Sequence, residues 1–252
     1  MKPKSITRRA AVLALLLTVA WLGIPSPAGA VERTFEARIS GSANDAKEAP
    51  FGIMDLDESV LDLGGLYRRI GLRFTGVDVP KNAGIIRAYI EFTVAGSDSS
   101  NTTLTIEAQA ADNPTEFTTT VMDIRNRVTY AASVDWYVNY AWQTEDAVHQ
   151  SAELKDLVQK IVNRSGWSAG NAMVFVITCN EEIYRRAKSW DLDPNKAPKL
   201  HIDYTANIIE VPIVASSDDI YQYYYSPTSG GYPIYNSHTF QMAGSTYNYP
   251  AL

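Results

Sequence analysis

Residues 66–94 contain two stretches in which apolar and polar residues strictly alternate. Every second residue is apolar in residues 69–74 and again in residues 86–94. Alternation with a period of two is typical of β-strands that bury one face and leave the other in water. The connecting residues 80–84, PKNAG, are typical of a turn. A pair of long strands with one apolar face needs a covering layer, so this segment predicts a sheet that packs against a second sheet or a helix.

Shorter patterns predict the rest of the fold. Strands are expected at 35–39, 60–63, 104–110, 173–178 and 199–204, with a polar loop at 40–48. Residues 124–140 are harder to assign. One helix is predicted after an N-cap at Ser151, because apolar residues recur there with helical spacing at Leu154, Leu157, Val158, Ile161 and Val162. Many strands with one short helix predict an all-β, antiparallel β-sandwich of the jelly-roll type.

The first 30 residues are predicted to be a secretory signal peptide. A basic start precedes an apolar run over residues 10–24, and the small residues at 28–30, AGA, form a cleavage site. The apolar run is short for a membrane span, so no membrane span is expected. Arg8 and Arg9 are compatible with twin-arginine export. The protein is therefore expected to be secreted or held at the cell surface. Its single cysteine, Cys179, indicates a bacterial source rather than a disulfide-stapled eukaryotic domain.

The charge balance excludes one class of partner. The formal net charge is −6, and removal of the four basic residues of the signal peptide brings the mature chain to −10. No cluster of Lys and Arg stands out in the sequence. No nucleic-acid partner is therefore expected.

An internal repeat predicts a second copy of the domain. The two matches pair residues 35–45 with 209–219 and residues 60–65 with 240–245. Self-similarity at a spacing of about one domain is typical of tandem modules. We therefore expect residues 31–205 to form one jelly-roll module and residues 206–252 to be the start of a truncated second copy. The sequence is then a fragment of a protein with at least two such modules.

Four phrases in residues 32–205 resemble a family of secreted bacterial modules. They are GLRF at 71–74, AYIEF at 88–92, IVNRSGW at 161–167 and PKLHIDY at 198–204. These phrases are similar to those of the DNRLRE-type, galactose-binding-domain-like jelly rolls, which include carbohydrate-binding modules and commonly occur in tandem. The resemblance implies a glycan or cell-surface polysaccharide as partner, together with further copies of the same module. Because the phrases are mostly core positions, they identify the fold better than the ligand.

The resemblance also implies a calcium site built from acidic loops. The family pattern has an acidic loop after the first strand and an acidic run after the strand at 104–110. Hard oxygen ligands clustered in loops are what calcium needs. This chain has Gln109 and Ala110 where carboxylates are expected, and Lys188 at a position that is commonly acidic. The oxygen ligands that remain are Asn44, Asp45, Glu48 and Asp112.

Aromatic residues are the predicted platform for a ligand: Trp136, Tyr137, Tyr140, Trp142 and Trp190. The apolar faces of sugar rings pack on exposed indole and phenol rings, and sugar hydroxyls then need polar partners nearby. Asn139, Gln143 and Asp191 are the expected partners. The alternative is that Trp136 and Trp142 cap the end of the sandwich as core residues.

Catalytic patterns are weak in this sequence. Residues 166–170 match the G-x-S-x-G nucleophile elbow, but that motif needs a strand before the serine and a helix after it, and here the order is reversed. The three histidines show neither metal-ligand spacing nor a serine partner. We therefore expect a non-catalytic extracellular carbohydrate-binding or adhesion module. The alternatives are a structural spacer domain in a surface protein and an accessory domain of a polysaccharide-degrading enzyme.

Overall fold

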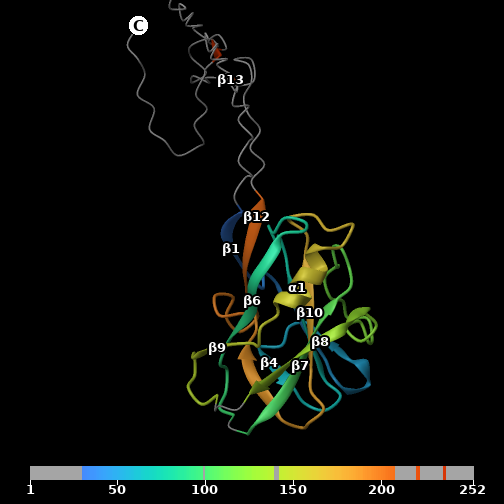
Figure 1. Ribbon diagram of the computed structural model, residues 1–252. Coiled ribbons are helices and arrows are strands. Elements are labelled where there is room, and N and C mark those ends of the chain that lie inside the picture. Colours follow the sequence, from blue (N-terminus) through green and yellow to red (C-terminus); the bar gives the residue numbers. More distant parts are fainter. Residues whose placement is uncertain (1–29, 99, 139–141, 208–219, 222–234, 237–252) are drawn as a thin grey trace, which may run out of the picture.

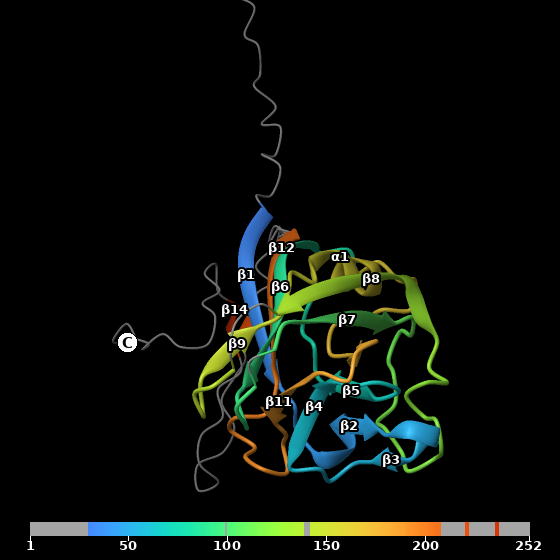
Figure 2. The same ribbon diagram turned by 90° about the horizontal axis from the view of Figure 1, so that it is seen from below.

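The computed structural model describes residues 30–98, 100–138, 142–207, 220–221 and 235–236, and two antiparallel sheets form its main body (Figures 1 and 2). The four-stranded sheet has the order β1 (Ala30–Arg38), β12 (Lys199–Asn207), β6 (Gly84–Thr93) and β9 (Val148–Gln150). The six-stranded sheet has the order β3 (Met54–Asp55), β2 (Asp45–Glu48), β5 (Arg69–Phe74), β10 (Met173–Thr178), β7 (Thr102–Gln109) and β8 (Thr129–Val138). These sheets confirm the predicted antiparallel β-sandwich of the jelly-roll type.

Smaller elements complete the described residues. β11 (Tyr184–Lys188) pairs with β4 (Val60–Gly64), and β13 (Ile220–Tyr221) pairs with β14 (Tyr235–Asn236). One α-helix is described, α1 (Lys155–Val162), with two 3₁₀ turns, η1 (Ser42–Asn44) and η2 (Pro50–Gly52). Most of the predicted signal peptide and of the predicted second copy lies outside the described residues. Among the described helices, none has the length and apolar character to cross a membrane.

The two alternating stretches form strands but do not pair with each other. β5 lies between β2 and β10 in one sheet, whereas β6 lies between β12 and β9 in the other. The predicted pairing was therefore wrong: the connection 75–83 passes from one sheet to the other, and its Val77 and Val79 are buried in the core. Both strands still direct their apolar residues into the space between the sheets. An alternating pattern shows which face of a strand is buried. It does not show whether two such strands pair in one sheet or lie in facing sheets.

Several strands lie where no strand was predicted. The polar loop expected at 40–48 instead contains β2, which pairs with β5 so that Asp45 lies opposite Leu72 and Glu48 opposite Arg69. Residues 129–138, in the segment that was hard to assign, form β8, the edge strand beside β7. Strands β9 and β11 were also not predicted. Strands β2 and β11 bury charged residues, Asp45 and Glu48 in β2 and Arg185 and Lys188 in β11, which conceals these two strands from a hydropathy pattern.

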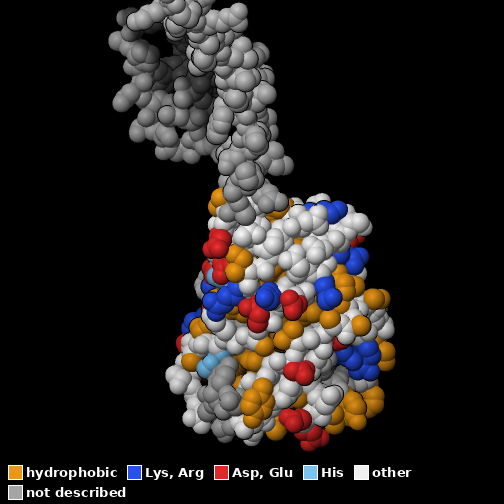
Figure 3. Space-filling view, viewed as in Figure 1, with side chains coloured by type: hydrophobic (Ala, Val, Ile, Leu, Met, Phe, Trp, Pro, Cys, Tyr) orange, Lys and Arg blue, Asp and Glu red, His pale blue; other side chains and the backbone are white. Residues whose placement is uncertain are grey.

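The helix is confirmed, but its predicted cap is wrong. Helix α1 buries the predicted apolar face, and its N-cap residue is Leu154, without a side-chain capping bond. The Ser151 hydroxyl oxygen instead accepts a hydrogen bond from the Ile90 amide at 3.0 Å. The serine therefore ties the chain before the helix to strand β6. Acidic and basic side chains are interspersed over the face of the molecule that includes α1 (Figure 3).

A covering segment, residues 111–128, lies on the outer face of the six-stranded sheet (Figure 2). Its Phe117 and Ile124 are buried against Val174 and Val176 of β10, which form a second hydrophobic cluster apart from the main core. The Phe117 ring lies directly over Gly71, where an added Cβ would come within 2.4 Å of the ring Cζ atom. A glycine in β5 therefore allows the covering segment to approach the sheet.

The Gly71→Ala variant is expected to lower the free energy of unfolding by about 2 kcal/mol, because the added methyl group overpacks a closed contact. Chemical denaturation of both proteins measures the difference. Gly41→Ala is the matched control, because the nearest atom to an added Cβ there is Asn44 Nδ2 at 3.5 Å. Equal stability of the two variants would contradict the close packing of Phe117.

Candidate ligand-binding site

The predicted aromatic platform is divided between the core and the surface. Trp136 is 4% exposed and stacks on Phe92 with ring centroids 5.5 Å apart, and Trp142 is 0% exposed and stacks on His149 at 5.0 Å. A ring covered in this way has no free face for a sugar, so the expectation that these two tryptophans are exposed is corrected. Tyr140 lies outside the described residues.

The other two aromatic residues differ in exposure. Tyr137 follows Trp136 on β8 and therefore points to the opposite side, where it is 57% exposed. Trp190 is half-buried and packs against the main core. Only Tyr137 among the described members of the predicted set therefore offers a largely exposed ring.

The four predicted oxygen ligands do not come together. Three of them accept hydrogen bonds from arginine side chains: Asn44 from Arg73, Glu48 from Arg125 and Asp112 from Arg164. A guanidinium thus supplies the positive charge that an ion was expected to supply. Within the described residues, no group of three or more His, Cys, Asp or Glu side chains is placed to hold a metal ion. The predicted set of four therefore does not fit a calcium ion as one site.

Asp45 is the member of that set without an arginine partner. It is 2% exposed, and its Oδ2 accepts a hydrogen bond from the Trp190 amide at 2.8 Å. Its Oδ1 is buried without a hydrogen-bond partner in the described part of the chain, as is Asp191 Oδ2. Burial raises the pKa of Asp45 to about 7, and the nearby Asp191 carboxylate contributes to the increase. The two carboxylates form a pair whose charge needs a proton or a cation.

A groove of about 210 Å³ lies on the outer face of the six-stranded sheet, where β5 begins and β10 ends. Its lining is Leu66, Tyr67, Arg68, Arg69, Arg125, Thr178, Cys179 and Asn180. Arg69 lies opposite Thr178 of β10 and opposite Glu48 of β2. Because opposed residues of antiparallel strands share a face, these side chains all lie on the outer face of the sheet. Arg125 reaches the groove from the covering segment, so three separate parts of the chain build this groove: residues 66–69, Arg125 and residues 178–180.

Tyr67 supplies the exposed ring of the groove. It is 68% exposed and has a φ of 64°, in the left-handed region that non-glycine residues rarely adopt. Gly64 and Gly65 just before it also have positive φ, 107° and 86°. The chain thus makes a strained turn between β4 and β5 that presents a phenol ring to solvent.

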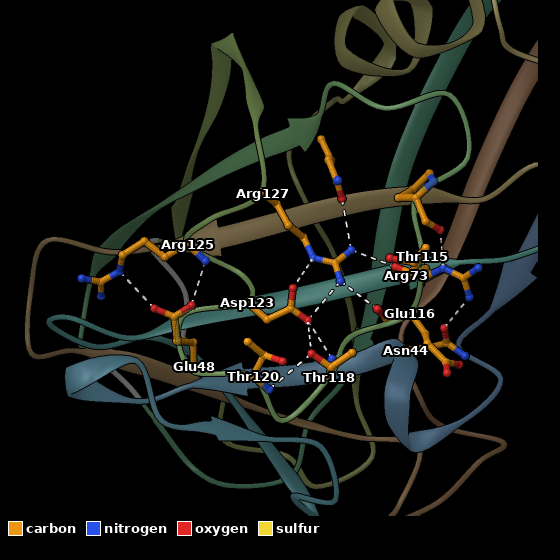
Figure 4. A network of polar contacts seen from close by, with 12 residues as sticks. Asn44, Glu48, Arg73, Thr115, Glu116, Thr118, Thr120, Asp123, Arg125 and Arg127 are labelled. Carbon is orange, nitrogen blue, oxygen red and sulfur yellow. Dashed lines mark hydrogen bonds and ion pairs between the residues drawn. The ribbon is translucent and has the colours of Figure 1, made fainter.

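The three arginines of the groove differ in how they are held. Arg68 donates to Asp62 at 3.0 Å. Arg125 uses its backbone amide and its Nε to bind the buried carboxylate of Glu48, at 2.7 and 3.0 Å. Figure 4 shows the two terminal nitrogens of Arg125 pointing away from Glu48. The side chain of Arg69 makes no hydrogen bond or ion pair with any other described residue.

Sequence reasoning missed this groove for a specific reason. The adjacent Tyr67, Arg68 and Arg69 could have been noticed as an aromatic residue beside two basic ones. Arg125 is distant in sequence, and only the covering segment brings it to the end of β5. Tyr137 and the buried tryptophans were predicted because they are close together in the sequence. The residues that line the groove are close together only in the folded chain.

Comparison with known proteins does not add a family. The chain matches no protein-family model and no curated protein. Among solved structures it is similar to an exo-β-1,3-galactanase from Phanerochaete chrysosporium with galactose, at 12% identity and a TM-score of 0.29, over 68% of this chain and 29% of the galactanase chain. It is also similar to a chain of Mud crab tombus-like virus, at 10% identity and a TM-score of 0.29, over 86% of this chain and 98% of the viral one. At these TM-scores neither likeness supports an inference about function.

Proposed function

We propose that this chain is a non-catalytic extracellular module that binds a glycan in the groove beside Tyr67. The supporting observation is the exposed Tyr67 ring, held by a strained turn next to a groove lined with hydrogen-bond donors. Sugar rings stack their apolar faces on such rings while their hydroxyls bind nearby polar groups. The predicted signal peptide supports an extracellular location. Tandem copies of the module would raise the apparent affinity for a polymeric ligand.

The Tyr67→Ala variant is expected to weaken glycan binding about tenfold, because loss of ring stacking and of the ring's buried area costs about 1.4 kcal/mol. The full chain is first screened on a glycan array. The strongest ligand is then titrated calorimetrically into the original protein and the variant. Alanine and tyrosine pay a similar energetic cost for the left-handed backbone conformation. The stability of the fold is therefore not expected to change.

Tyr137→Ala is the matched control, because Tyr137 is an exposed tyrosine on the six-stranded sheet that carries the groove. Its affinity is expected to be unchanged. Loss of binding in Tyr137→Ala alone would move the site to β8, where the sequence predicted it. A folded protein that binds no glycan on the array would contradict the proposed function and favour a structural spacer.

A further inference from the structure

The groove has an excess of positive charge although the chain is acidic. Its lining contains three arginines, and none of the described residues that line it is acidic. The two carboxylates next to these arginines are already engaged, Glu48 with Arg125 and Asp62 with Arg68. Three positive charges against two negative ones leave a net positive site in a chain of formal charge −6.

Arg125 is held in a fixed orientation. The carboxylate of Glu48 is completely buried and accepts both the backbone amide and the Nε of Arg125. The terminal nitrogens therefore point away from Glu48 (Figure 4). A guanidinium presents its donors in a planar fork that matches the two oxygens of a carboxylate or the oxygens of a sulfate. A fork that is held in advance loses little freedom when it binds such a group.

Arg69 supplies a charge without a partner inside the described chain. It is half-buried on the outer face of β5, between β2 and β10 in the ladder. A half-buried cation that makes no ion pair attracts an anion more strongly than an exposed one, because solvent screens it less. The nearby ring of Tyr67 places a stacking surface beside it.

We propose that the groove selects acidic glycans, with Arg69 and Arg125 binding the carboxylate or sulfate of a sugar unit that stacks on Tyr67. The proposal rests on the glycan-binding function above and adds the chemical class of ligand. At about 210 Å³ the groove is smaller than a pocket for a drug-sized molecule, at least about 300 Å³, so it suits one acidic sugar unit of a chain. An extended nucleic-acid strand needs a longer basic track than this isolated groove.

The test uses the full chain and titrates it with oligogalacturonate and with the same oligomer fully methyl-esterified. The ester keeps the sugar rings and removes the charge. We expect the acid to bind about tenfold more tightly than the ester, because hydrogen bonds to an ionised group are the stronger ones. The Arg69→Gln variant is expected to reduce that difference severalfold, because Arg125 remains, and to leave binding of the ester unchanged. A sulfated dextran is titrated in parallel, and its binding through Arg69 would identify sulfate as the source of the acidic group.

Arg33→Gln is the matched control, because Arg33 is exposed on β1 in the other sheet and the charge change is the same. Its affinities are expected to match those of the original protein. Equal binding of acid and ester would overturn the acidic selectivity and leave the proposed glycan function standing. Binding of none of these probes, together with a blank glycan array, would overturn both. Binding of a DNA oligonucleotide with the same dependence on Arg69, and not of the acidic glycans, would overturn the assignment to a glycan.

Discussion

The Asp45→Asn variant is expected to be more stable than the original protein at pH 8, by on the order of 4 kcal/mol, and about equally stable at pH 4. The pKa of Asp45 is raised from its ordinary value of 3.8 to about 7 in the folded protein, chiefly because burial disfavours its charge. Each unit of difference between the folded and unfolded pKa corresponds to about 1.4 kcal/mol. Asparagine keeps the acceptor for the Trp190 amide and has no charge to bury.

The direction follows from proton binding. Between pH 4 and pH 7 the folded state keeps a proton on Asp45 that the unfolded state has already lost. The contribution of Asp45 to stability is therefore fully present below pH 4 and is lost as the pH rises through about 7. Urea denaturation of both proteins at several pH values measures the effect. The difference between the two curves removes the contributions of the other titrating groups.

Asp193→Asn is the matched control for this pH effect, because Asp193 lies in the same loop as Asp191, the carboxylate near Asp45, and is only partly buried. Parallel pH curves for the original protein and Asp45→Asn would contradict an uncompensated charge at Asp45. Repeating the series with calcium and with a chelator tests whether a calcium ion binds at Asp45 and Asp191. If calcium stabilises the original protein at pH 8 but not Asp45→Asn, then a cation rather than a proton compensates the Asp45–Asp191 pair.

The predictable part of this fold is the part in which polarity reports burial directly. Strands β5, β6, β7 and β12 and helix α1 bury an apolar face, strand β10 is apolar and buried on both faces, and the positions of all six were predicted within a few residues. Sheet membership was not predictable in the same way. Hydropathy shows that Leu72 and Ile90 are buried, but not whether they are neighbours in one sheet or face each other across the core.

Strand β2 shows why some elements were missed. Its residues Asp45, Lys47 and Glu48 are charged, and the pattern DAKE is typical of a loop. Asp45 and Glu48 are nevertheless buried. The burial of Glu48 depends on Arg125, which lies 77 positions further along the chain. A local window of sequence cannot show a partner at that distance.

The prediction of the aromatic platform was wrong for a different reason. Residues 133–138, SVDWYV, alternate, and the alternation places Val134, Trp136 and Val138 on one face and Tyr137 on the other. That local signal was available, and it separates the two adjacent aromatic residues. The groove at Tyr67 depends instead on a contact between β5 and the covering segment, so only the structure locates it.

The Arg127→Met variant is expected to lower the free energy of unfolding by about 3 kcal/mol, because it leaves a largely buried carboxylate without its ion-pair partner and two carbonyl groups without their donor. The Arg127 side chain is 7% exposed and forms an ion pair with Asp123 at 3.2 Å (Figure 4). It also donates to the carbonyl oxygens of Thr115 and Glu116, each at 2.8 Å, and its guanidinium carbon lies 4.2 Å from the centre of the Phe117 ring. Urea denaturation measures the loss of stability.

The segment that opens first in Arg127→Met distinguishes a specific role in holding the covering segment from a general loss of stability. Because Arg127 binds partners in and beside the covering segment, amide hydrogen exchange is expected to accelerate in residues 111–128 before it accelerates in β5 or β10. Arg127→Lys keeps the charge but loses the planar fork, so an intermediate effect is expected. Opening of the segment also displaces Arg125, so Arg127→Met should weaken the binding of oligogalacturonate although Arg127 does not line the groove. Unchanged exchange in residues 111–128 would show that Phe117, and not Arg127, holds the covering segment on the sheet.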